Sequence, residues 1–299
     1  MYATALVAGW TVVPAVAAQQ TESRVRANSG PSQVEDTAAD TAERFGRVPQ
    51  RFVIDLGGYL PNVSTHARVS THLRTGSNVN FENQLGLAPN TQTFNADASW
   101  RISRHNFLSF DYFSFGRSGT KQIGDSIVWG SNVYRAGSTI DGNAGFSYYG
   151  LSYRYYIWRE SNWELGPGFG IDGLNVSSSL AVQVATSGPR TARQDSAHTK
   201  ASVTVPVPLL GLFGDWEFVP RVFLKGGGQF IYINNINNYG GRMADGILGF
   251  EWYPFHNFGL GGVYHYIALH VSKTSARTGN SVKFDYTVQG PALYVAVTF

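Results

Sequence analysis

From residue 51 onward, apolar and polar side chains alternate over repeated stretches of the chain. In residues 143–158, for example, Tyr149, Leu151 and Tyr153 fall on one face and Arg154 falls on the other. A period of two residues is the period of a β-strand, because successive side chains point to opposite faces. One face is apolar or aromatic, and the other is small or charged. The pattern therefore predicts an all-β chain whose strands separate two different environments.

This alternation predicts ten strands joined in sequence. Their ranges are 51–66, 92–103, 105–117, 143–158, 162–178, 201–215, 218–234, 241–253, 257–271 and 282–299. Charged residues make up only 14% of the chain and aromatic residues also 14%, yet the mean hydropathy is −0.15. A chain that is rich in aromatics but lacks long apolar runs is typical of a membrane barrel, in which every second residue faces lipid. We expect a transmembrane antiparallel β-barrel of about ten strands, with roughly 8 to 12 as the compatible range.

The predicted connections alternate in length. They are short after the second, fourth, sixth and eighth strands, and mostly longer and polar after the odd-numbered strands. Outer-membrane barrels have short periplasmic turns and long outer loops, so both termini are expected in the periplasm. Tryptophans near the short turns predict an aromatic girdle at that side of the membrane; these are Trp100, Trp158, Trp163, Trp216 and Trp252.

The end of the chain carries a more specific motif. Apolar residues occupy alternate positions up to a terminal aromatic, namely Leu293, Val295, Val297 and Phe299. This ending resembles the C-terminal signature of bacterial outer-membrane proteins. The resemblance implies recognition by the barrel-assembly machinery and a location in the outer membrane of a Gram-negative-type bacterium. Upstream, the apolar positions change phase, and we interpret this change as a β-bulge at Gly290-Pro291.

The first 50 residues have a different composition. Residues 1–18 are mostly small and apolar and end in an A-x-A pattern, which is typical of an export signal. Residues 19–50 are rich in Gln, Thr, Ser and Ala, and we expect a flexible periplasmic leader. The barrel itself is assigned to residues 51–299. The absence of cysteine excludes disulfides and thiolate metal sites, and nothing in the sequence implies a cofactor or a metal.

If the apolar face points outward, the polar face lines the lumen. The charged or titratable residues on it are Asp55, Asp97, Arg101, Asp111, Arg154, Glu164, Asp172, Lys225, Asp245, Glu251 and His265. A ten-stranded barrel is narrow, so we expect a hydrated network of ion pairs that plugs it. The alternative is a narrow cation-preferring pore, because acids outnumber bases. The mild net charge of +3 and the lack of any basic stripe give no support to nucleic-acid binding.

A candidate catalytic group occurs near the end of the ninth strand. His270, Ser272 and Asn280 resemble the His-x-Ser element of outer-membrane lipid hydrolases such as phospholipase A and the lipid A deacylases. The resemblance implies that His270 is the base, Ser272 the nucleophile and Asn280 the orienting group. Those enzymes carry Asn directly after the Ser, where this chain has Lys273. The omptin proteases share the barrel size, but their acid pair and Asp–His pair have no Asp-x-Asp or Asp-x-His counterpart here.

The predicted outer loops carry more cations than acids. Arg68, Arg74, Lys273 and Arg277 are examples, and such groups could pair with phosphates of lipopolysaccharide or other outer-membrane lipids. Three functions therefore stay open. They are a structural or narrow-pore barrel that contacts lipopolysaccharide, a lipid hydrolase, and a barrel subunit of a larger envelope assembly. The sequence does not decide the oligomeric state.

Overall fold

The computed structural model describes residues 51–129, 132–183, 197–236, 239–275 and 277–299. The predicted export signal (1–18) and leader (19–50) lie outside the described residues. Within the described ranges, no helix is both long enough and apolar enough to span a membrane.

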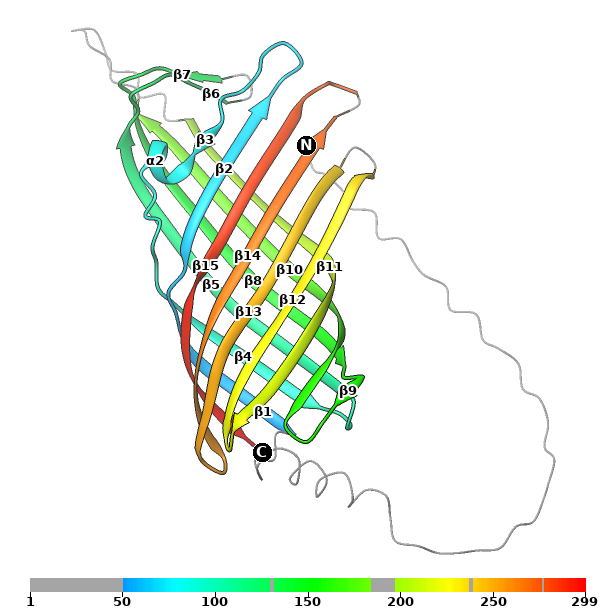
Figure 1. Ribbon diagram of the computed structural model, residues 1–299. Coiled ribbons are helices and arrows are strands. Elements are labelled where there is room, and N and C mark those ends of the chain that lie inside the picture. Colours follow the sequence, from blue (N-terminus) through cyan, green and yellow to red (C-terminus); the bar gives the residue numbers. More distant parts are fainter. Residues whose placement is uncertain (1–50, 130–131, 184–196, 237–238, 276) are drawn as a thin grey trace, which may run out of the picture. The chain divides into compact units, whose positions relative to one another are not determined.

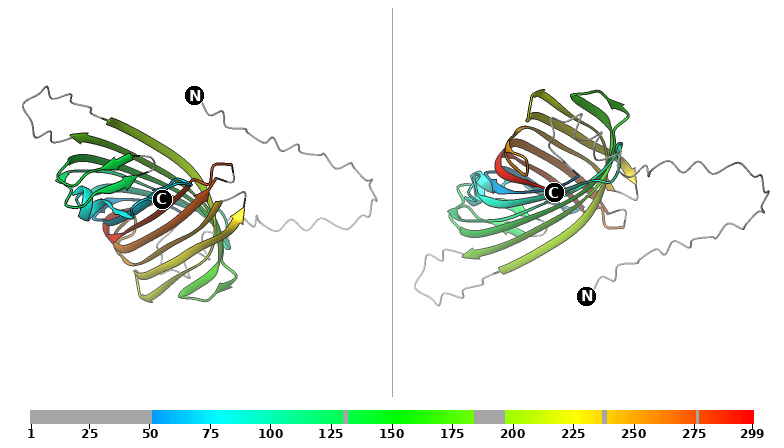
Figure 2. Two further views of the ribbon diagram at one scale, coloured as in Figure 1. Left: turned by 90° about the horizontal axis from the view of Figure 1, so that it is seen from above. Right: turned by 90° about the horizontal axis from the view of Figure 1, so that it is seen from below.

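The described chain forms a closed antiparallel barrel, as predicted (Figure 1). Its first strand consists of β1 (Phe52–Tyr59) followed directly by β2 (Asn62–Ser70). The others are β4 (Thr93–Arg101), β5 (Asn106–Gln122), β8 (Thr139–Tyr155), β10 (Trp163–Gln183), β11 (Ala197–Val219), β12 (Val222–Ile236), β13 (Tyr239–Phe255), β14 (Phe258–Thr274) and β15 (Ser281–Thr298). Each strand pairs with the next, and β1 pairs with β15 to close the ring. Ten strands therefore circle the lumen, which Figure 2 shows end-on.

The first strand bends away from its neighbour halfway along the barrel. Its pairing with β15 keeps one register, because Tyr59 pairs with Ala292 and Asn62 with Gln289. On the other side only β1 pairs with β4, since β4 is short. The chain between β2 and β4 forms β3 (Val79–Asn80) and the short helix α2 (Phe81–Leu85) instead of the simple loop that the sequence predicts.

Helix α2 packs beside β2 and β5 at the long-loop end of the barrel. Arg117 of β5 donates to the Glu82 carboxylate at 2.7 Å and to the Thr65 hydroxyl at 2.8 Å, and the backbone N–H of Thr65 donates to Glu82 at 3.0 Å. Glu82 thereby satisfies a backbone N–H on the edge of β2, just before the two residues, His66 and Ala67, that pair with β3. The remaining elements are the β6–β7 hairpin (Ile127–Trp129 and Asn132–Tyr134) and β9 (Trp158–Arg159).

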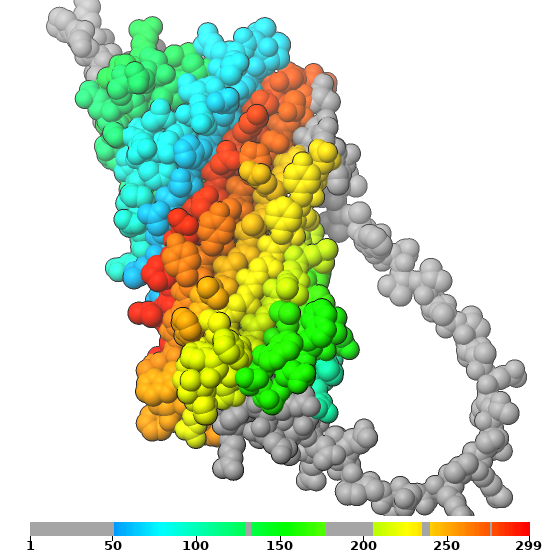
Figure 3. All heavy atoms as spheres, in the orientation of Figure 1, coloured from blue at the N-terminus to red at the C-terminus, as the bar shows by residue number. Residues whose placement is uncertain are grey.

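An apolar belt covers the outward face of the barrel. On β14 and β15 it includes Leu260, Tyr264, Tyr266 and Leu293, which are between 41% and 69% exposed. In a closed barrel such side chains face lipid, so their exposure is what a bilayer requires. Figure 3 shows the face formed by β2, β15, β14, β13 and β12, whose strands run side by side at a tilt.

The final strand differs from its prediction in one respect. Residues of β15 pair with β14 in an unbroken register from Phe258↔Val297 to Thr274↔Ser281, so the predicted bulge at Gly290-Pro291 is wrong. Tyr286 and Val288 point into the barrel, whereas Leu293 and Val295 point out. The apolar residues change phase along the sequence because the outer half of the lumen is itself apolar.

Candidate functional site

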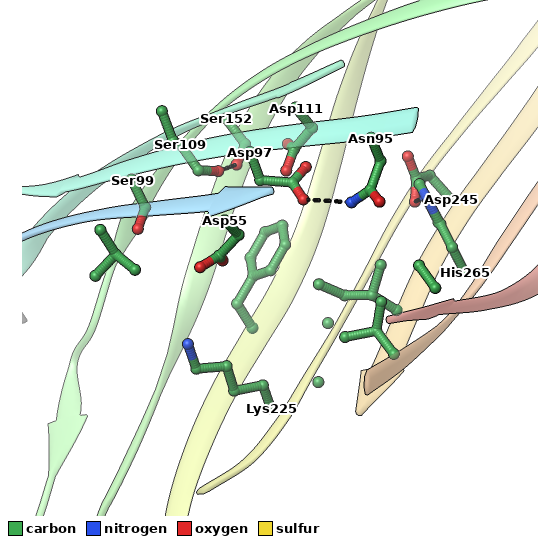
Figure 4. Close-up of a pocket in the computed structure, with 18 of the residues that line it drawn as sticks. Asp55, Asn95, Asp97, Ser99, Ser109, Asp111, Ser152, Lys225, Asp245 and His265 are labelled. Atoms are coloured by element: carbon green, nitrogen blue, oxygen red, sulfur yellow. Dashed lines mark hydrogen bonds and ion pairs between the residues drawn. The ribbon is translucent and has the colours of Figure 1, made fainter. Parts of the chain in front are cut away.

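The lumen near the short-turn end is lined by charged side chains. All of the charged or titratable residues predicted to line the lumen lie on the inward face, either buried or half-buried. Eight of them line one cavity of about 130 Å³, namely Asp55, Asp97, Arg101, Asp111, Arg154, Lys225, Asp245 and His265. Figure 4 shows six of them, Asp55, Asp97, Asp111, Lys225, Asp245 and His265, around the cavity on several strands. The cavity is therefore enclosed by polar groups of both signs.

Ion pairs connect both adjacent and non-adjacent strands at this level. Arg101 donates to Glu164 through two nitrogens, at 2.5 and 3.2 Å, and Arg159 contacts the same carboxylate at 3.1 Å. Lys225 pairs with the fully buried Glu251. Because an unpaired buried charge is costly, these contacts compensate the charges that the lumen encloses.

The same arrangement includes a histidine. His265 Nε2 lies 3.0 Å from Asp245 Oδ1, and the Tyr148 hydroxyl donates to the other oxygen of Asp245 at 2.6 Å. The rings of Tyr59 and Phe113 also pack against the His265 ring. We call Asp245 and His265 the lumen pair, and Tyr148 is the tyrosine hydrogen-bonded to it.

Above the charged level, aromatic and aliphatic side chains fill the lumen. Phe113 stacks on Tyr148 with centroids 5.0 Å apart, and Phe146 stacks on Tyr286 at 4.9 Å. Their neighbours come from strands all around the ring and include Tyr59, Leu174, Leu209, Met243 and Ile267. The sequence reading missed this aromatic plug because it assigned apolar side chains to the outward face. The available signal was the phase of β5, because Phe113 and Phe115 lie on the same face as Asp111, which was assigned to the lumen.

A second constellation lies on the outward face near the long loops. Across β13, β14, β15 and β2, the residues paired in register are Arg242, His270, Asp285 and His66, and the next row is Gly240, Ser272, Lys283 and Arg68. We call these two rows the outer-rim patch. Inward neighbours such as Met243, Leu269 and Tyr286 are packed in the lumen, so alternation places the patch residues outward.

The outer-rim patch contains a histidine–carboxylate contact that no motif on one strand could reveal. His270 Nδ1 is hydrogen-bonded to Asp285 Oδ1 on the neighbouring strand. Ser272 lies two residues after His270 on the same face, and its hydroxyl donates to the Gly240 carbonyl at 3.3 Å. The residue that contacts His270 is thus Asp285, fifteen positions farther along the chain, and not Asn280.

Asn280 lies in the loop after β14 and is occupied elsewhere. Its side-chain oxygen accepts a hydrogen bond from the backbone N–H of His72 at 3.3 Å. The pair Thr274↔Ser281 lies between Asn280 and the patch, two pairs beyond Ser272. Each residue advances a strand by about 3.4 Å, so Asn280 lies too far beyond the patch to orient His270.

The predicted girdle residues lie near the short turns and are 36% to 53% exposed; they are Trp100, Trp158, Trp163, Trp216 and Trp252. The terminal residues also face outward, with Leu293 at 69% and Phe299 at 65% exposed. The start of the first strand and the end of the last strand meet there, because the backbones of Phe52 and Phe299 exchange two hydrogen bonds. An outward apolar belt with an aromatic edge is the arrangement expected of a barrel in a bilayer.

Among known proteins, the chain has matches in fold but none in sequence family. No protein-family model matches the sequence, and no curated protein matches it. Among solved structures, the chain is similar to the outer membrane protease OmpT from Escherichia coli, with a TM-score of 0.50 and 11% identity over 83% of this chain and 97% of that chain. The fold is that of a bacterial outer-membrane β-barrel.

A second solved structure that this outer-membrane barrel matches is the outer membrane protein OprG from Pseudomonas aeruginosa. The identity is 9% over 84% of this chain and 98% of that chain, with a TM-score of 0.36. At such identities the likeness concerns the fold alone, so the activity of OmpT is not transferred to this barrel.

Proposed function

We propose that this outer-membrane barrel is sealed and that its outer-rim patch binds the phosphate groups of outer-leaflet lipids such as lipopolysaccharide. The observation that carries the proposal is the aromatic plug, since Phe113, Phe146 and Tyr286 fill the lumen above the charged cavity. A filled lumen favours the structural barrel over the narrow cation pore. The surface left for recognition is then the outward face and the outer loops.

The charge of the outer-rim patch suits an anionic headgroup. Arg242 and Lys283 are exposed and Arg68 is half-exposed, while the acid within the two rows is Asp285. On β14, the ten residue steps from Leu260 to His270 span about 25 Å along the membrane normal for a strand tilted by about 40°. This length matches the height of a typical apolar belt, so the patch lies at the level of the headgroups.

Binding to lipids with and without phosphate tests this proposal. We expect phosphorylated lipid A to raise the thermal midpoint of the refolded barrel more than dephosphorylated lipid A does, because only the former can pair with the three cations. The triple variant Arg68→Gln, Arg242→Gln and Lys283→Gln should lose that difference. Arg104→Gln, at the short-turn end, provides the matched control and should keep it.

The opposite results would contradict the proposal. Equal stabilisation by both lipids, or a phosphate effect that survives the triple substitution, would remove the outer-rim patch from lipid recognition. The stabilisation should also weaken as salt rises, because exposed charges are screened.

A further inference from the structure

The outer-rim patch combines three side chains of hydrolytic type. Asp285 accepts a hydrogen bond at Nδ1 of His270, which leaves Nε2 of the same ring free to act as a base. Side chains two residues apart on a strand lie about 7 Å apart at their Cα atoms, so the Ser272 hydroxyl is within reach of the ring. The hydroxyl now bonds to the Gly240 carbonyl at 3.3 Å, and a rotation about its χ1 angle would turn it toward Nε2.

The depth of these residues in the bilayer determines which part of a lipid they can contact. Below His270 on the outward face of β14 lie Tyr266, Tyr264 and Leu260, all exposed to the bilayer. His270 and Ser272 follow immediately above this belt, where β15 presents Asp285 and Lys283. The acyl esters of membrane lipids lie at this boundary between chains and headgroups. An ester carbonyl of a lipid beside the barrel can therefore reach Ser272.

Positive charge lies next to the serine and the histidine. Lys283 is the register partner of Ser272, and Arg242 is the register partner of His270. Directly paired residues have Cβ atoms about 5 Å apart, so the long side chains of both cations can reach the position of the ester carbonyl. A cation at that place stabilises the oxyanion that forms when a carbonyl is attacked.

We propose that Ser272 and His270, positioned by Asp285, hydrolyse acyl esters of phosphate-bearing lipids in the outer leaflet. The Ser272 oxygen attacks the ester carbonyl while His270 Nε2 takes the hydroxyl proton, and His270 then returns this proton to the departing alcohol oxygen. Water next attacks the acyl-serine ester, gives its proton to His270, and releases the fatty acid and free Ser272. The balance is one ester and one water consumed, and one alcohol and one acid formed. This activity goes beyond lipid binding, but it rests on the proposed position of the patch in the outer leaflet.

Fatty-acid release from mixed micelles tests the activity. The full chain, refolded in detergent, is incubated in separate arms with phosphatidylethanolamine and with lipid A, and released fatty acid is measured by mass spectrometry. We expect release in at least one arm, and the arm identifies the lipid source. Ser272→Ala should reduce the rate at least about 100-fold, whereas Ser64→Ala, on the outward face of neighbouring β2, should leave it unchanged.

Asp285→Asn tests the positioning role separately. We expect it to lower kcat by about 10²- to 10⁴-fold with little change in KM, because a carboxamide no longer holds the productive tautomer of His270. A purely structural role for Asp285 would reduce the yield of heat-modifiable barrel instead of kcat. A fluorophosphonate probe should also label wild-type protein at Ser272, which peptide mass spectrometry locates.

Three results would overturn this inference. They are a folded wild-type barrel that releases no fatty acid in either arm, release that persists in Ser272→Ala, and labelling at a different serine. None of them affects the phosphate-dependent stabilisation by lipid A. Failure of the hydrolytic proposal can therefore be distinguished from failure of the lipid-binding proposal.

Discussion

Two histidine–aspartate pairs have their histidines on β14, but the two pairs differ in exposure and in neighbouring side chains. His265 pairs with Asp245 inside the lumen, where the side chains are 14% and 6% exposed. His270 pairs with Asp285 on the outward face, where they are 37% and 52% exposed. The two histidines are five residues apart, and an odd separation on a strand places them on opposite faces.

The neighbours of each pair explain what it can do. The lumen pair is held by the Tyr148 hydroxyl and enclosed by aromatic rings, and the inward residues beside His265 on β14 are Val263 and Ile267. Neither of these inward neighbours carries a hydroxyl that could serve as a nucleophile. The outer pair has Ser272 beside it and meets lipid. The same two residue types therefore support structure in one place and favour reactivity in the other.

The largest effect that distinguishes the pairs should be on stability. Asp245→Ala leaves His265 and the Tyr148 hydroxyl buried without their shared partner, so we expect a loss of about 3–5 kcal/mol in the free energy of unfolding. Asp285→Ala should cost less than about 1 kcal/mol, because exposed ion pairs contribute little. Urea unfolding of the refolded barrel, followed by heat-modifiable migration in gels, measures both. Equal losses would mean that the two pairs do not differ as described.

An intermediate effect is expected at Tyr148. Tyr148→Phe keeps the ring that stacks on Phe113 but removes the 2.6 Å hydrogen bond to Asp245. A hydrogen bond to a charged group contributes about 1.5–3 kcal/mol, which is the loss we expect in the same unfolding assay. Tyr149→Phe, on the next and outward-facing position, should change stability by less than about 0.5 kcal/mol. A comparable loss in both variants would argue against the lumen pair with its tyrosine as a stabilising unit.

The smallest effect should be seen at Asn280. Because this residue bonds to the His72 backbone in the loop, Asn280→Ala should change fatty-acid release by less than about twofold. The rates of this variant and of Asp285→Asn, measured side by side, decide which residue orients His270. A large loss in Asn280→Ala together with an unaffected Asp285→Asn would restore the assignment that the sequence suggests.

The strand ranges could be predicted because the bilayer imposes a uniform apolar exterior on every strand. Alternation along one strand is a local property, and it was sufficient to place the ten strands and the short turns. The inside of the barrel is less uniform. Tyr286 and Val288 face a plug that many strands build together, and the sequence of β15 alone does not reveal it. The same cause produced the wrong bulge at Gly290-Pro291.

The candidate site could be predicted only in part. His270 and Ser272 are two residues apart, so their spacing already places them on one face. Asp285 joins them through the pairing of β14 with β15, and this register depends on the length of the intervening loop. Asn280 was assigned instead from the resemblance to outer-membrane lipid hydrolases, which does not reveal the register between strands. Helix α2 was missed because its five residues are too few to show a helical period.

The central claim is that the lumen is sealed and stabilises the barrel, whereas the outward face binds and acts on lipids. Planar-bilayer recording tests it most directly. The sealed barrel predicts no conductance steps from the wild-type protein across a range of voltages. The variant Phe113→Ala with Phe146→Ala, which removes two rings of the aromatic plug, should produce small cation-selective steps through the acid-rich cavity below. Steady steps from the wild-type protein, with the same selectivity, would contradict the account and establish the narrow pore in its place.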